Sequence, residues 1–226
     1  MMKNTRTRCF SGKAFNLLIL SLGRRAKRQI MKIFSPLLFP YLCIMALSGC
    51  SLFGHSGVEI APYKVLEKED ALELRHYERL VLATTAMPSG MNDQRDPFYK
   101  LFDYISGKNE STKKIPMTAP VFMDQADEAT ESMSFVLPES FLIETAPIPK
   151  DPAVKLEEIV NYTVAAITFS GSLNQDTINT HKIILEEWIA RKGFEKRGAA
   201  KAAGYNPPFT IPALRRNEVL IPVLKP

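Results

Sequence analysis

The region from residue 58 to residue 226 contains the same order of predicted elements twice, and this repeat constrains the fold more than any other feature of the sequence. Each half contains strand segments, then one helix, then further short extended segments. Strands and helices that follow one another in this way are typical of an α+β domain. The repeat therefore predicts an antiparallel sheet or distorted barrel with two helices on its outside.

The first half has a well-marked helix between its strands. Asp96 followed by Pro97 is typical of a helix start, because aspartate caps a helix and proline suits its first turn, and Gly107 ends this helix. Its apolar stripe consists of Phe98, Leu101, Phe102 and Ile105. The strand segments around it are residues 72–77, 80–86, 117–123 and 133–137.

The second half repeats this order with a longer helix. Residues 162–169 predict a strand, and a helix then begins near Asn174 or Gln175 and ends at Gly193. Extended segments at residues 209–211 and 219–223 complete the half. One face of the predicted helix carries Ile178, Leu185, Trp188 and Ile189.

Charge divides the chain into two parts with different properties. Residues 1–49 contain nine of the 29 basic residues and no acidic residue, so residues 50–226 contain the other 20 together with all 24 acidic ones. The net charge of +5 therefore comes from the first part, and the rest is slightly acidic. A nucleic-acid-binding domain needs a dense basic face, so we expect no nucleic-acid partner.

The first part has the features of a lipoprotein signal peptide. From Met31, one lysine and an apolar run over residues 33–47 precede Leu47-Ser48-Gly49-Cys50, which resembles the bacterial lipobox. This predicts lipidation of Cys50 after cleavage, and translation that starts at Met31 in place of Met1. We expect a leader and signal peptide at 1–49, the lipidated cysteine and a tether at 50–57, and one domain at 58–226.

The same pattern predicts where the protein is located. Ser51 after the cysteine resembles the pattern of lipoproteins sent to the outer membrane, and a diacyl anchor is sufficient for stable attachment. We expect a lipid-anchored protein of the cell envelope, on the outer membrane and facing the periplasm. Cleavage removes Cys9 and Cys43 and lipid blocks Cys50, so thiol catalysis is excluded for the mature chain.

No common catalytic motif is present in the sequence. The chain lacks G-x-S-x-G, H-E-x-x-H, the P-loop, G-x-G-x-x-G and C-x-x-C-H. Acidic residues are scattered, so an acid–base pair formed by spatial neighbours stays open, with Glu73, Glu78 and Glu218 as the nearest candidates. We expect a protein that is not an enzyme.

His76 is the histidine with the clearest functional interpretation. It alternates in phase with Leu72 and Leu74 and so shares the apolar side of its strand, opposite Glu73 and Arg75. An imidazole on an apolar face can bind haem iron as an axial ligand, but it can equally be a core histidine hydrogen-bonded to the backbone.

Methionine and aromatic residues are plentiful and allow two interpretations. Phe98, Phe102, Met117 and Tyr205 fit either the core or an adaptable apolar cleft for a flat ligand. Arg215, with Arg216 and the Lys113-Lys114 pair, could face carboxylates such as haem propionates or could be solvated surface.

Six segments, in order along the chain, resemble the SOUL haem-binding protein family. The resemblance extends from about Glu59 to Val223, which is essentially the whole expected domain. The segments are 74–77 (LRHY), 104–109 (YISGKN), 114–121 (KIPMTAPV), 147–152 (PIPKDP), 203–208 (AGYNPP) and 216–219 (RNEV).

The resemblance implies a distorted antiparallel β-barrel of two pseudo-symmetric halves with two flanking helices. It also implies non-covalent binding of haem or another tetrapyrrole in an apolar cleft, with His76 at the position proposed as axial iron ligand in some members. The first hypothesis is therefore a haem-binding envelope lipoprotein; the alternatives are an enzyme acting on a tetrapyrrole or other small hydrophobic molecule, and an envelope interaction module. The candidate cofactor-binding residues are His76, Leu74, Phe98, Phe102, Met117, Tyr205 and Arg215.

Overall fold

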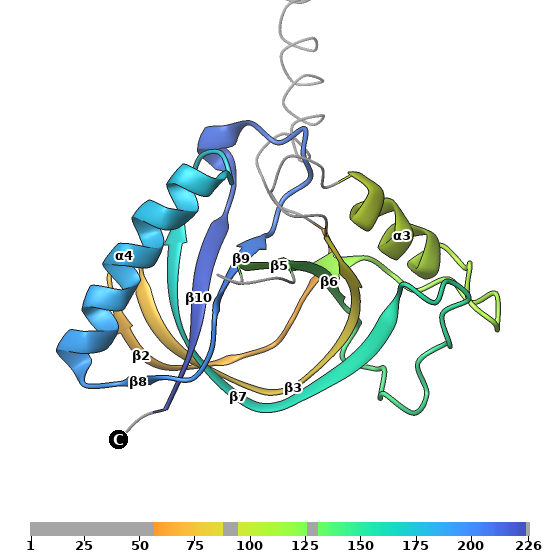
Figure 1. Cartoon of the computed structure of the whole chain (residues 1–226), viewed down its shortest axis with the longest axis horizontal. Coiled ribbons are helices and arrows are strands. Elements are labelled where there is room, and N and C mark those ends of the chain that lie inside the picture. Colours follow the sequence, from red (N-terminus) through yellow and green to blue (C-terminus); the bar gives the residue numbers. More distant parts are fainter. Residues whose placement is uncertain (1–56, 88–94, 126–130, 225–226) are drawn as a thin grey trace, which may run out of the picture. The chain divides into compact units, whose positions relative to one another are not determined.

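A computed structural model describes residues 57–87, 95–125 and 131–224 (Figure 1). The predicted leader at 1–49 and nearly all of the tether at 50–57 lie outside the described residues, so these boundaries stay predictions. Within the described ranges, no helix has the length and apolar character needed to span a membrane. The elements are β1 (Glu59–Ile60), β2 (Lys64–Glu69), β3 (Leu72–Ala86), α3 (Arg95–Ile105), β4 (Thr118–Ala119), β5 (Val121–Gln125), β6 (Ser132–Val136), β7 (Lys155–Phe169), α4 (Gln175–Lys192), β8 (Glu195–Lys196), β9 (Ala200–Gly204), the 3₁₀ helix η2 (Pro212–Leu214) and β10 (Asn217–Leu224).

Six antiparallel strands form a closed ring. Their order is β3, β6, β5, β9, β10 and β7, and β7 pairs back onto β3 to close it. Strand β2 extends one edge of β3, and β8 pairs with the end of β10. The two helices lie on the outside of the ring, on opposite sides in Figure 1. The predicted α+β barrel of two similar halves is therefore confirmed.

Helix α4 begins and ends where the sequence predicts. The side chain of Asn174 accepts a hydrogen bond from the Thr177 backbone, and the Thr177 side chain accepts one from the Asn174 backbone, which forms a capping box. Gly193 ends the helix in the left-handed conformation, with φ of 71°. Its buried residues are Ile178, Leu185, Trp188 and Ile189, the predicted face.

Helix α3 differs from the prediction in which side chains it buries. Leu101 and Ile105 are buried as expected, but Phe102 is 43% exposed and Tyr104 is buried in its place. The Tyr104 hydroxyl donates a hydrogen bond of 2.8 Å to the carbonyl oxygen of Pro147, so its polar end is satisfied inside. The buried stripe is therefore rotated toward Tyr104.

Two strand predictions need correction. Residues 209–211 are not a strand: they precede η2 in a loop, and the pairing strand is β9, whose small residues gave no strand signal. Strand β7 begins at Lys155, earlier than the predicted start at 162, because residues 155–160 pair with the second half of β3. Polar residues there hid the strand from a search for apolar runs.

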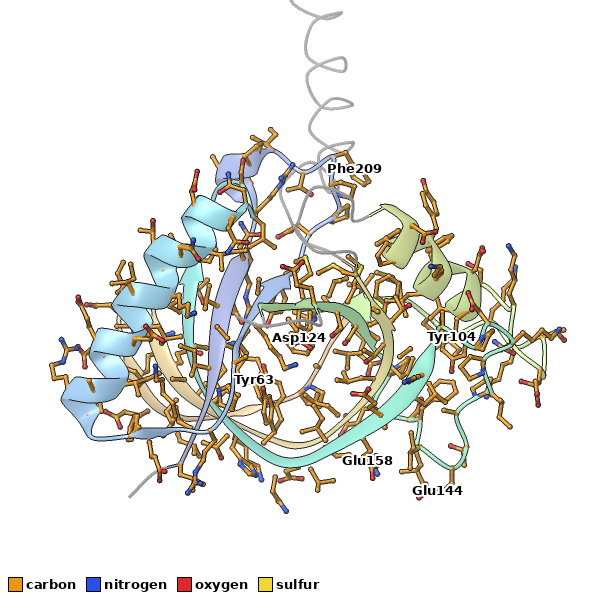
Figure 2. The ribbon with its side chains drawn as sticks, viewed as in Figure 1. Tyr63, Tyr104, Asp124, Glu144, Glu158 and Phe209 are labelled. Atoms are coloured by element: carbon orange, nitrogen blue, oxygen red, sulfur yellow. The ribbon has the colours of Figure 1, made fainter. Side chains whose placement is uncertain are left out.

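The sheet has a core on each of its two faces. The outer core lies between the strands and the two helices and includes Leu74, Leu101 and Trp188. The inner core contains strand residues such as Tyr77 and Phe122 and no helix residue, which places it inside the ring. Figure 2 shows the labelled side chain of Tyr63 within the ring of strands. Closure of the ring buries the inner face of its strands, and the two helices cover parts of the outer face.

Candidate functional site

A groove opens where two strands stop along the same edge of β3. Strand β2 pairs with β3 as far as His76, and β6 pairs with it from Leu82, so the segment between them has neither neighbour for most of its length. The groove beside this segment has a volume of about 450 Å³, within the range of ligand sites. Its walls are Pro62, Tyr63, Lys64, His76, Glu78, Arg79, Leu80, Val81, Val136, Leu137, Pro138, Glu139 and Phe141.

His76 lines this groove in a fixed orientation. Its Nδ1 lies 3.0 Å from Oγ1 of Thr163, which is directly opposite on β7. The residue is only partly buried. Because Nδ1 makes this contact, Nε2 is the ring nitrogen left to bind a ligand, and the threonine would hold the ring in place, as hydrogen-bonding partners do for metal-binding histidines.

The rest of the groove combines apolar walls with a charged rim. Leu80, Val81 and Phe141 supply buried apolar surface. Lys64 and Glu78 form an ion pair at the rim, with side chains 70% and 69% exposed. The hydrogen bond and the charge of Lys64 lower the pKa of Glu78 below its usual value. An imidazole and apolar walls suit a flat apolar ligand, and the rim carries the cations Lys64 and Arg79 together with the carboxylates Glu78 and Glu139.

A second polar site lies inside the ring and is built differently. Glu218 is fully buried and accepts hydrogen bonds from two nitrogens of Arg75, at 2.6 and 3.0 Å. Arg216 donates two more, at 2.7 and 3.0 Å, and the hydroxyls of Tyr205 and Thr168 donate at 2.9 and 3.1 Å. We call Arg75, Tyr205, Arg216 and Glu218 the inner cluster.

The electrostatics of the inner cluster keep its charges fixed. Burial alone would raise the pKa of Glu218, but the hydrogen bonds and charges of Arg75 and Arg216 outweigh it and hold that pKa below its usual value. Arg75 also donates to Glu73 at 2.7 Å, so both carboxylates that flank it are ionised and engaged. Carboxylates held this way are poor proton donors and acceptors at neutral pH.

Three predicted site residues lie on or beside α3, away from His76. Phe98 stacks on Phe102, with ring centroids 6.0 Å apart and planes 12° apart, and also contacts the ring of Phe135. Met117 packs against the outer core. With Tyr99, which is 60% exposed, Phe98 and Phe102 form an aromatic face that we call the α3 face. None of these residues belongs to the groove walls.

The other three predicted residues are separate again. Leu74 is fully buried in the outer core, and Tyr205 belongs to the inner cluster. Arg215 lies in the loop before β10, where its guanidinium donates to the carbonyl oxygens of Thr210 and Pro208. Of the predicted set, His76 is the residue that lines the groove, and the binding roles of the whole set stay predictions.

Sequence reasoning missed most of the groove and all of the inner cluster as a unit. Lys64, Arg79 and Phe141 line the groove but lie in no recognised motif. The inner cluster had an available signal, because all four of its residues fall in the segments 74–77, 203–208 and 216–219 that carry the resemblance. Among the described residues, no group of three or more His, Cys, Asp or Glu side chains is arranged to hold a metal ion.

The fold and the groove together define a two-helix antiparallel barrel protein with a ligand-sized groove beside β3. Solved structures share this fold at low identity. The C-terminal domain of EcmrR aligns with a TM-score of 0.52 at 13% identity, covering 73% of this chain and 99% of that chain. A hydrolase from Listeria innocua aligns with a TM-score of 0.50 at 10% identity, covering 70% and 94%. At such identities the likeness shows the fold alone.

Sequence comparison identifies the family within this class. The family described as SOUL heme-binding protein matches residues 58–222, and the chain belongs to this family. Heme-binding protein 1 of Sus scrofa is 28% identical over 181 residues, covering 75% of this chain and 94% of the relative. Heme-binding protein 2 of Homo sapiens is 32% identical over 171 residues, covering 70% and 81%.

Proposed function

We propose that this protein binds haem or a related tetrapyrrole non-covalently in the groove lined by His76, and that it is a binding protein and not an enzyme. The observation that carries the proposal is the orientation of His76, whose Nδ1 is held by Thr163 beside apolar walls. Family membership supports the choice of ligand. The engagement of Glu73 and Glu218 with arginines supports binding over acid–base catalysis.

The residues of the groove fit haem in three respects. Nε2 of His76 would supply a nitrogen ligand to the haem iron. Leu80, Val81 and Phe141 offer apolar surface to the macrocycle, and Lys64 and Arg79 offer cations to its propionates. Burying roughly 300 Å² of apolar macrocycle would contribute about 7.5 kcal/mol before the costs of association.

We also propose that Cys50 carries the lipid that anchors the protein to the outer membrane, facing the periplasm. The support is the apolar run and the Leu47-Ser48-Gly49-Cys50 segment of the sequence. Mass spectrometry of the mature N-terminus, together with membrane fractionation, tests this directly. A Cys50→Ser variant should lose the lipid mass and leave the membrane fraction, and a wild-type chain without lipid at Cys50 would contradict the proposal.

A parallel titration tests ligand binding. The full chain is purified in detergent and titrated with ferric haem and, separately, with a metal-free porphyrin, with empty micelles as the blank. Saturable binding of both is expected, with tighter binding of haem if iron ligation contributes. Absence of saturable binding for both would overturn the proposal. The α3 face is the competing location, and a Phe102→Ala variant that weakens both ligands while His76→Ala weakens neither would move the site there.

A further inference from the structure

The loop between β9 and β10 presents apolar side chains to solvent. Phe209 is 84% exposed, which is the highest value among the large apolar residues that the structure describes, and Ile211 and Leu214 are 53% and 44% exposed. Figure 2 shows Phe209 at the upper edge of the described barrel. Three exposed apolar residues within six positions are unusual on a monomer surface and often mark an interaction site.

The loop is held in this conformation by its own hydrogen bonds. Arg215 donates to the carbonyl oxygens of Thr210 and Pro208 at 2.8 and 2.6 Å. The backbone N–H of Gly171 donates to the carbonyl oxygen of Pro212 at 2.9 Å, which ties the loop to the end of β7. These hydrogen bonds therefore hold the loop in the conformation in which Phe209 is exposed.

The loop emerges at the end of the barrel where the described chain begins. Strand β1 pairs with β4, which is followed after one residue by β5. The first residue of β5, Val121, pairs with Gly204 at the end of β9, and the loop begins at the next residue. The start of β1 and the apolar loop thus share one end of the molecule.

The length of the tether limits how far this end can lie from a lipid anchor. Seven residues, 51–57, separate Cys50 from Val58. A fully extended segment of this length spans roughly 25 Å. An anchor at Cys50 would therefore keep the end that carries Phe209 close to the bilayer surface.

The charge around the loop is compatible with that position. No acidic residue occurs between Glu195 and Glu218, and Arg215 is the one cation within residues 206–215. Aromatic and aliphatic side chains beside arginine favour the interface of an anionic bilayer.

We propose that the loop at residues 206–215 is a second membrane contact, in which Phe209 inserts into the bilayer interface beside the lipid anchor. This inference rests on the anchoring at Cys50 proposed above. Together, the anchor and the loop would hold one defined end of the barrel on the membrane. The anchor alone would leave the barrel free to rotate on its tether. The partner that the loop contacts is the bilayer surface, and not a second copy of the chain or the tetrapyrrole.

Tryptophan fluorescence tests this insertion. The full lipidated chain carrying Phe209→Trp is reconstituted into vesicles of phosphatidylethanolamine and phosphatidylglycerol, against the fixed background of the buried Trp188. The expected result is a blue-shifted emission and protection from aqueous acrylamide. The matched control is Val160→Trp: Val160 is 56% exposed and lies nine positions along β7 from Phe169, which pairs with the start of β10 beside the loop. This control should stay accessible to acrylamide.

The outcomes separate this inference from the anchoring proposal. If Cys50 is lipidated but vesicles leave the emission of the Phe209→Trp chain unchanged, the loop contact is overturned while the anchor stands. Protection produced by added haem, or by a rise in protein concentration without vesicles, would overturn it in favour of a ligand or a second copy. If Cys50 carries no lipid, flotation of the Cys50→Ser chain with the same vesicles tests the loop alone. A fall in vesicle binding of about tenfold when Phe209→Asp is added to this chain would support the loop contact. Absence of vesicle binding by the Cys50→Ser chain itself would overturn it.

Discussion

Arg75 and His76 are adjacent in the sequence but belong to two different sites. The side chain of Arg75 points into the ring, where it is 1% exposed and pairs with Glu218. The side chain of His76 points to the outer face, where it lines the groove and contacts Thr163. The alternation of a β-strand separates them, since successive side chains point to opposite faces.

This difference shows that one motif, residues 74–77, contains a residue that serves folding and a residue that lines the binding groove. The inner cluster saturates its own charges with partners from β3, β10 and the residue after β9, so it joins strands that are distant in the sequence. The groove leaves an imidazole nitrogen available to an outside molecule, beside a rim where Lys64 pairs with Glu78. Changes in the inner cluster should therefore act on folding, and changes in the groove should act on binding.

The largest expected effect comes from breaking the inner cluster. Glu218→Ala leaves the buried guanidinium of Arg75 and the part-buried one of Arg216 without their main acceptor, so the free energy of unfolding should fall by about 3–5 kcal/mol. Urea denaturation followed by circular dichroism measures this. A loss below about 1 kcal/mol would show that the cluster is not a structural centre.

Alkaline pH should lower the free energy of unfolding by a smaller amount than Glu218→Ala, through a tyrosine inside the ring. Burial raises the pKa of Tyr77 to about 12. The unfolded hydroxyl ionises first, near pH ~10, so this contribution is complete below pH ~10 and is lost as the pH rises toward 12. The cost at the end of this window is about 2–3 kcal/mol. Unfolding curves at pH 8 and 11 should diverge less for Tyr77→Phe than for the wild type; equal divergence would contradict this assignment.

Replacing His76 should affect the ligand and spare the fold. His76→Ala is expected to weaken ferric haem binding by about tenfold, equivalent to 1.4 kcal/mol, and to shift the Soret band, because the proposed bond from His76 to the iron would be lost. Binding of a metal-free porphyrin should change little. An unchanged haem titration would remove His76 from the site. A large loss of stability would show that His76, like Arg75, acts on folding.

The smallest expected effect comes from breaking the exposed ion pair between Lys64 and Glu78 at the groove rim. Lys64→Ala breaks an ion pair that solvent screens, so stability should change by less than about 1 kcal/mol. Haem affinity should fall modestly if Lys64 meets a propionate, and this fall should shrink at high salt. Titrations at two ionic strengths measure both effects, and a loss of affinity that ignores salt would place Lys64 away from the propionates.

The fold could be predicted from the sequence because its local signals agree with the structure. Asn174 and Gly193 mark the ends of α4, and the order of elements repeats in each half. The burial of Arg75 inside the ring could not be predicted from periodicity, because Glu73 and Arg75 alternate with leucines as they would on a solvent-facing strand. Closure of the ring buries the inner face that carries Arg75, and closure depends on the pairing of β3 with β7 far along the chain.

The groove was out of reach for a related reason. His76 was identified from its strand phase and motif, but the groove beside it exists because β2 and β6 stop at different points along β3. Phe102 shows the same limit on α3, where helical spacing gave the stripe but not its rotation toward Tyr104.

The boundaries of the groove also bear on how this site could evolve. Its width is set by where β2 and β6 stop along one edge of β3. Two residues added to the end of β6 would move its boundary by about 7 Å along β3. Insertions and deletions at these ends could thus resize the site for larger or smaller molecules in descendants that keep the same barrel.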